Sequence, residues 1–78
     1  MPKGLVKAYF VATVKRGTEH EVAQRIRKMK EITEVLVTYG LWDIIARIEA
    51  ESLEHLDKII TDIRKIPEIK QTNTLIGA

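Results

Sequence analysis

The chain has 78 residues, which is enough for one small domain, and we expect residues 1–78 to form it. It has no cysteine, so disulfides, thiolate metal sites and cysteine nucleophiles are excluded, and a net charge of +2 is too small to indicate a nucleic-acid surface. No apolar run approaches the roughly 18 residues of a membrane span, and nothing resembles a signal peptide, so we expect a cytoplasmic protein without a membrane partner.

The first predicted strand is Leu5–Val14, which is rich in β-forming residues and apolar on both of its faces. A helix is then expected from Thr18 to about Lys30. Glu21 follows Thr18 by three residues, which is the spacing of a capping box. In such a box each of the two side chains accepts a hydrogen bond from the other residue's free backbone N–H.

A β-hairpin is predicted for Val35–Ile48. Two apolar runs, Val35–Tyr39 and Trp42–Ile48, flank a tight step at Gly40 and Leu41. Glycine supplies the positive φ that such turns need. The hairpin also carries the only tryptophan of the chain and an aspartate within an apolar run, and a buried carboxylate is costly without a partner.

A second helix is expected to begin at Ser52 and to end before Pro67, because proline has no N–H donor and disfavours helix at the residue before it. The last predicted strand is Ile69–Ile76. It alternates apolar and polar residues and is more polar than the first strand, so we expect it near an edge of the sheet.

An internal repeat relates the two halves of the chain at a step of 34 residues, which carries Thr18 to Ser52. One βαβ unit is therefore written twice, and this predicts an α+β, ferredoxin-like βαββαβ fold with a four-stranded antiparallel sheet. Right-handed crossovers place both helices on one face of that sheet. Other pairs at the same step are Val14 and Ile48, Val22 and Leu56, and Ile26 and Ile60.

The sheet face away from the helices is expected to be unusually apolar for a monomer. Burying each large apolar side chain there is worth about 1.5–3 kcal/mol, so we predict a sheet-to-sheet homodimer. A few exposed apolar residues can also carry no meaning, but five or six on one face favour the dimer. The predicted interface residues are Leu5, Tyr9, Val11 and Ile45, and the apolar face extends to Leu36 and Ile76.

Four short patterns together resemble the effector-binding (RAM) domain of the Lrp/AsnC transcription regulators, over essentially the whole chain. The hairpin glycine and aspartate, followed by the closing Thr-x-Thr, are the most specific part. These regulators carry an N-terminal helix-turn-helix, but here the first sheet strand already begins at Leu5. The resemblance is therefore to a stand-alone form, for which we expect no direct DNA binding. The patterns are Gly17-Thr-x-x-Glu21-Val22, Ile32-x-Glu34-Val35, Thr38-x-Gly40-x-x-Asp43 and Thr72-x-Thr74.

The resemblance implies dimers that assemble further, commonly into rings of four dimers. It also implies a small effector, usually an amino acid, bound between dimers near the hairpin and the last strand. Transcription would be modulated indirectly, through co-assembly with full-length Lrp/AsnC-type regulators. Carried over by position, the candidate ligand-binding residues are Thr38, Tyr39, Gly40, Leu41, Trp42, Asp43, Thr72 and Thr74.

The chemistry of these residue types suits a free amino acid. The Asp43 carboxylate can accept a charge-assisted hydrogen bond from the ligand's ammonium group, and Gly40 lets a ligand carboxylate approach the backbone closely. Thr72 and Thr74 stand two apart in a strand, so their hydroxyls share a face. Trp42, or the hairpin tyrosine, can line an apolar side-chain pocket.

Each of these candidates also has a purely structural interpretation. Gly40 is the glycine that a turn requires, and Asp43 can equally pair with Arg47 or with a lysine near the hairpin. Trp42 suits an oligomer interface better than a ligand contact, and the two threonines are ordinary strand formers.

No metal, cofactor or catalytic site is expected. His20 and His55 are predicted on the solvent side of two helices, without further ligands at metal-binding spacing. No phosphate-binding loop, catalytic triad or carboxylate pair is visible, so we expect no enzyme. Two alternatives stay open: a dimeric enzyme of the small monooxygenase type, which needs a cavity within one subunit, and an ACT-like amino-acid-binding module.

Overall fold

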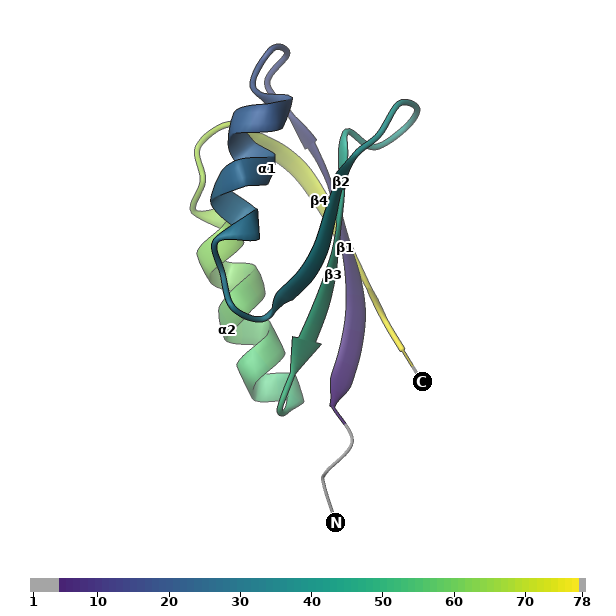
Figure 1. Ribbon diagram of the computed structural model, residues 1–78, viewed down its shortest axis with the longest axis vertical. Coiled ribbons are helices and arrows are strands. Elements are labelled where there is room, and N and C mark those ends of the chain that lie inside the picture. Colours follow the sequence, from purple (N-terminus) through teal and green to yellow (C-terminus); the bar gives the residue numbers. More distant parts are fainter. Residues whose placement is uncertain (1–4, 78) are drawn as a thin grey trace.

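The computed structural model describes residues 5–77 and has the element order βαββαβ. The four strands form one antiparallel sheet in the order β2-β3-β1-β4. Figure 1 shows both helices on one face of this sheet, with the opposite face uncovered. The predicted ferredoxin-like arrangement is confirmed. The elements are β1 (Val6–Val14), α1 (Glu19–Arg27), β2 (Ile32–Val37), β3 (Ile44–Ala50), α2 (Leu53–Arg64) and β4 (Ile69–Ile76).

The core lies between the sheet and the two helices. Alternate residues of β1 and β3 point toward the helices and meet the apolar stripes of α1 and α2. Within the described residues, every buried residue is hydrophobic. The repeat therefore has a physical meaning, since each βαβ half supplies two strands, which are not neighbours in the sheet, and one helix to the same core. The largest fully buried side chains are Phe10, Val22, Ile26, Ile44, Ile48, Leu56 and Ile63.

The two helices begin differently, although they occupy equivalent places in the repeat. Ser52 has an extended backbone, and its Oγ accepts a hydrogen bond from the His55 N–H at 3.0 Å, which caps α2 as expected. Thr18 makes no such bond, because its backbone is not extended and its hydroxyl donates to the Lys15 carbonyl at 2.6 Å. The predicted capping box with Glu21 is therefore wrong.

The first helix is shorter than predicted. It ends at Arg27, before the expected end near Lys30. The Met29 N–H donates to the Ile26 carbonyl at 3.1 Å, so the last turn tightens and the chain leaves the helix there.

The hairpin is present, but its turn is wider than predicted. The paired strands end at Val37 and Ile44, so residues 38–43 form the connection in place of a two-residue step. The Thr38 N–H closes this loop by donating to the Asp43 carbonyl at 2.8 Å. Gly40 has φ +128°, which confirms the turn glycine.

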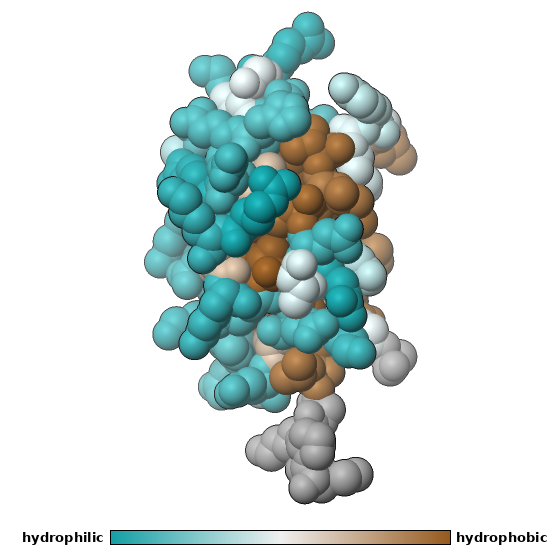
Figure 2. Space-filling view, in the orientation of Figure 1, coloured by the Kyte–Doolittle hydropathy of each residue, from teal (hydrophilic) through white to brown (hydrophobic). Residues whose placement is uncertain are grey.

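The uncovered sheet face carries exposed apolar side chains, as predicted. Tyr9, Leu36 and Leu75 are all exposed, and Ile45 between them is partly buried. Figure 2 shows hydrophobic surface gathered toward the sheet side of the molecule, beside a mostly hydrophilic helix side.

Two residues assigned to this face need correction. Val11 does lie on it, opposite Ile45 and Asn73 on the two neighbouring strands, although it is only 6% exposed within the subunit. Ile76 pairs with Ala8 and so lies on the helix side of the sheet. Leu5 precedes the first strand and lines a hollow at the end of the sheet, not the face itself.

No helix in the described part of the chain is long and apolar enough to cross a membrane.

Candidate functional site

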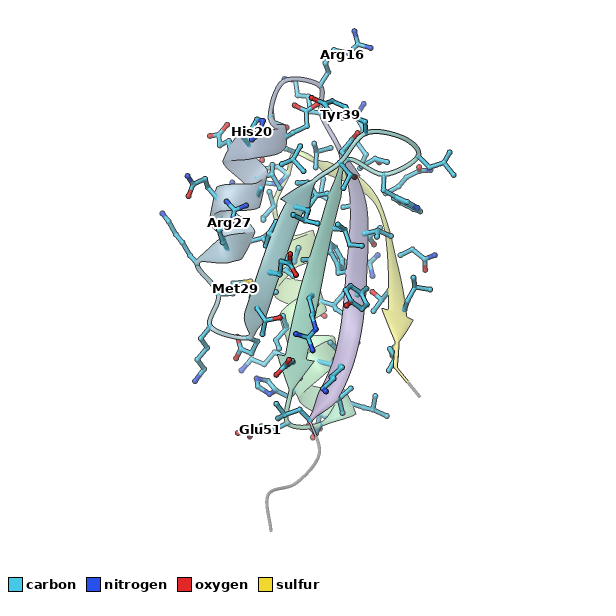
Figure 3. The ribbon with its side chains drawn as sticks, turned by 45° about the vertical axis from the view of Figure 1, so that its right-hand side comes forward. Arg16, His20, Arg27, Met29, Tyr39 and Glu51 are labelled. Carbon is cyan, nitrogen blue, oxygen red and sulfur yellow. The ribbon has the colours of Figure 1, made fainter. Side chains whose placement is uncertain are left out.

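Most predicted ligand residues lie at one end of the molecule. The loop 38–43 and the beginnings of α1 and β4 all lie at the end where β1 finishes. Figure 3 shows Tyr39 of this loop at the same end as His20 of α1, whereas Glu51 lies at the opposite end.

Six of the eight predicted residues divide between two hollows. The first, here called the hairpin hollow, has a volume of about 380 Å³ and combines the β2–β3 loop with the start of α1. It brings together four of the eight candidates, along with three residues that the sequence had not assigned. Its lining residues are Glu19, His20, Val37, Thr38, Tyr39, Gly40 and Asp43.

Asp43 is held by the backbone at the end of β1. Its Oδ2 accepts a hydrogen bond from the Val14 N–H at 2.9 Å, and its own N–H donates to the Ala12 carbonyl at 2.9 Å. Arg47, the proposed ion-pair partner, instead pairs with Glu49 at 3.0 Å. The expected Asp43–Arg47 pair is therefore wrong, and Oδ1 is the carboxylate oxygen left for a ligand.

Thr38 also has a structural partner. Its hydroxyl donates to the Trp42 carbonyl at 2.6 Å, across the loop. The hydroxyl oxygen keeps its acceptor lone pairs, so toward the hairpin hollow Thr38 can accept a hydrogen bond but not donate a second one.

The second hollow, here called the β4 hollow, has a volume of about 510 Å³ and lies along the first half of β4. It includes the predicted residues Trp42 and Thr72. Its lining residues are Trp42, Arg64, Ile69, Lys70, Gln71, Thr72 and Asn73.

The remaining candidates behave differently from one another. Thr72 and Thr74 pair with Ala12 and Phe10, so they share the helix side of the sheet, as their spacing predicted. Thr74 lines neither the hairpin hollow nor the β4 hollow. Leu41 lines neither as well, and it is almost fully exposed at the tip of the loop.

The sequence analysis missed Glu19, His20, Arg64 and Lys70 as members of the hollows. A helix that follows β1 must begin at the end of the sheet where β1 stops, which is also where the β2–β3 loop lies. The βαβ order alone could therefore have predicted that Glu19 and His20, at the start of α1, lie near the β2–β3 loop. Nothing comparable places Arg64 in the same hollow as Trp42, because that placement depends on how α2 packs.

A third group lies at the opposite end of the sheet. His55 Nε2 is 3.0 Å from Glu31 Oε2, and His55 Nδ1 accepts the Glu51 N–H at 3.2 Å. The His55 side chain is partly exposed and is held by these two partners, whereas His20 is exposed as expected.

The pKa of the Glu31 carboxyl is lowered from its ordinary value of 4.5. Partial burial is the largest single influence and raises this pKa. Hydrogen bonds from the Glu31 backbone N–H and from His55, together with the charge of Lys30, outweigh the burial. This group links the α1–β2 connection to the start of α2 and includes no candidate ligand residue.

A family model described as the Lrp/AsnC ligand binding domain matches residues 7–77. The chain belongs to the Lrp/AsnC family. The resemblance drawn from the hairpin and Thr-x-Thr patterns is thus confirmed, and the ACT-like alternative is set aside.

Curated relatives of this Lrp/AsnC domain are transcription regulators. The HTH-type transcriptional regulator FL11 of Pyrococcus horikoshii is 35% identical over 69 residues, which are 88% of this chain and 46% of the regulator. FL11 of Pyrococcus abyssi matches over the same shares at the same identity. The chain therefore spans about half the length of these relatives.

Solved structures agree with this assignment. FFRP-DM1 has a TM-score of 0.90 and 39% identity, with 94% of this chain and 99% of that chain covered. The hypothetical protein PHS023 from Pyrococcus horikoshii has a TM-score of 0.89 and 39% identity, over 94% and 89% of the two chains. The AsnC protein of E. coli, with a TM-score of 0.84 and 26% identity, is covered over 50% of its length by 92% of this chain.

Proposed function

We propose that this Lrp/AsnC domain is an effector-binding module that takes an amino acid in the hairpin hollow. It forms a sheet-to-sheet homodimer that assembles further, up to an octamer, in the cytoplasm. Its effect on transcription is indirect, through co-assembly with full-length Lrp/AsnC-type regulators, and the domain itself does not contact DNA.

The observation that carries this proposal is the convergence of Thr38, Gly40 and Asp43 on one hollow. Its volume of about 380 Å³ lies within the range of about 300–1,000 Å³ that is usual for small-molecule sites. Asp43 and Glu19 give the hollow two carboxylates, which suit the ammonium group of an amino acid. Gly40 has no side chain to keep the ligand's carboxylate from the backbone.

The test is titration calorimetry of the purified protein against each of the twenty amino acids. We expect a saturable signal near one ligand per subunit in the wild type. Asp43→Asn should weaken that signal by about tenfold or more, because the variant loses the charge but keeps an oxygen that accepts the Val14 N–H. Glu49→Gln, at the far end of β3, is the matched control and should bind like the wild type.

A flat response to all twenty amino acids at millimolar concentration, from a folded protein, would overturn the proposal. So would equal binding by the wild type and Asp43→Asn, because the ligand would then lie elsewhere.

The apolar core supports a binding role over the monooxygenase-type alternative. Such an enzyme needs acids, bases or other polar groups facing a cavity within one subunit. In the described residues every fully buried side chain between sheet and helices is hydrophobic, among them Phe10, Ile44 and Ile48.

A further inference from the structure

Both charged side chains that line the β4 hollow are cations. Arg64 projects from the last turn of α2 and Lys70 from the second residue of β4, and both line the hollow. No carboxylate lines it within residues 5–77, and neither cation has an ion-pair partner among those residues. Two like charges on one concave surface repel each other, and an anion between them relieves that repulsion.

A local structural reason accounts for only one of the two cations. A basic residue in the last turn of a helix is stabilised by the helix dipole, which is sufficient reason for Arg64. Lys65, its neighbour, has its own partner in Asp62 at 3.6 Å and does not line the hollow. Lys70 lies on a strand, where no dipole favours it, yet it lines the same hollow as Arg64.

The other lining groups suit a carboxylate with a short aliphatic chain. The Asn73 amide oxygen already accepts the Thr74 N–H at 2.9 Å, so its NH₂ group remains to donate. The Thr72 hydroxyl can donate as well. Trp42 and Ile69 supply the apolar surface against which methylene groups can pack.

The charged side chains that line the two hollows thus differ in sign. The hairpin hollow has Glu19 and Asp43 and no lysine or arginine, whereas the β4 hollow has two cations and no acid. Trp42 of the β4 hollow and Asp43 of the hairpin hollow are adjacent in the chain. A ligand with two carboxylates matches the two cations of the β4 hollow better than a neutral amino acid does, because a neutral amino acid carries only one.

We propose that the β4 hollow binds a short-chain dicarboxylate, so that the effector of this domain is an acidic amino acid. Arg64 and Lys70 select the second carboxylate. The inference rests on the proposed function in taking an amino acid as the effector, but the dicarboxylate site itself can be tested apart from it.

The experiment compares glutamate, its isostere glutamine, and glutarate, which has both carboxylates and no amino group. Calorimetry with the wild type should give glutamate an affinity about tenfold or more above that of glutamine, as expected for one charge-assisted contact. Arg64→Gln and Lys70→Gln should each remove about tenfold of glutamate affinity and leave glutamine unchanged. Lys65→Gln is the control and should leave both affinities unchanged.

The outcomes separate the two proposals. Binding of glutarate with an affinity near that of glutamate supports the dicarboxylate site and overturns the amino-acid part of the proposed function. Binding of a neutral amino acid, with glutamate and glutarate both weak, overturns the dicarboxylate site and leaves the proposed function standing. No binding by any of these ligands or the other amino acids overturns both, and an equal loss in Lys65→Gln overturns the placement at Arg64 and Lys70.

Discussion

Asp43 combines a structural contact with a place in the lining of the hairpin hollow. One of its carboxylate oxygens fixes the backbone at Val14, 29 residues away in the chain, and the other remains for the hairpin hollow. A residue chosen from a motif for its charge is therefore also part of the frame that shapes the site. This dual role decides which substitution tests which property.

We expect Asp43→Ala to destabilise the fold by about 1–3 kcal/mol, because the part-buried Val14 N–H loses its acceptor. Asp43→Asn should cost clearly less, since the amide oxygen replaces that acceptor. Urea unfolding of both variants measures the difference. Equal losses in the two variants would mean that the charge of Asp43, not its hydrogen bond, stabilises the fold.

The Glu31 carboxyl makes the free energy of unfolding depend on pH. Its pKa in the folded state lies below the ordinary value of 4.5, so its contribution is present above about pH 4.5 and is lost as the pH falls through the folded-state pKa. Glu31→Gln keeps an acceptor for His55 but removes the charge. We expect the wild type to exceed this variant in free energy of unfolding near neutral pH, with a gap that closes below pH 4.5. Urea unfolding across pH checks this, and a constant gap would contradict it.

At the scale of elements, the repeat fixes where the helices lie but not how each one begins. Thr18 and Ser52 are equivalent by position, yet only Ser52 caps its helix. The difference arises from the turn before α1, where Gly17 has φ +90° and the Thr18 N–H is bonded to the Lys15 carbonyl. That turn leaves Thr18 without the extended backbone that a cap needs.

The two cap positions therefore form a matched pair of variants. Ser52→Ala should destabilise the fold by about 0.5–2 kcal/mol, because the His55 N–H loses its acceptor. Thr18→Ala should cost less than about 0.5 kcal/mol, since it removes only an exposed bond to the Lys15 carbonyl. Thermal or urea unfolding compares them, and a larger cost at Thr18 would show that the repeat positions are not distinguished in this way.

At the scale of the whole molecule, the uncovered sheet face is the feature without a partner inside one subunit. Tyr9, Leu36 and Leu75 expose about half of their surfaces there, around the partly buried Ile45. A domain of this size gains stability if that face packs on a second copy.

Leu36→Lys should therefore shift the protein toward the monomer, because a lysine covered by a sheet-to-sheet interface loses its hydration without a partner. Leu53→Lys is the control. Leu53 on α2 is 61% exposed and Leu36 is 50% exposed, so the two substitutions are similar in exposure but lie on different surfaces. Sedimentation velocity at matched concentration measures the distribution, and an equal effect of both variants would argue against the sheet-to-sheet dimer.

The order of strands and helices, the core-facing residues and the turn at Gly40 were all determined by the sequence alone. Each depends on periodicity, a cap or breaker residue, or a backbone angle, and these properties act between near neighbours in the chain. The 34-residue repeat extended them to the topology, because two βαβ units of similar pattern have few ways to share one sheet.

Only the tertiary structure decided which side chains share a hollow. Glu19 joins Asp43, Arg64 joins Trp42, and His55 meets Glu31 across 24 residues of chain. These contacts depend on strand register and on how the helices pack, including a register shift in the β1–β4 pairing after Thr13. A local sequence pattern does not predict which of these side chains come together. They belong to different elements, and the packing of the core sets the distance between those elements.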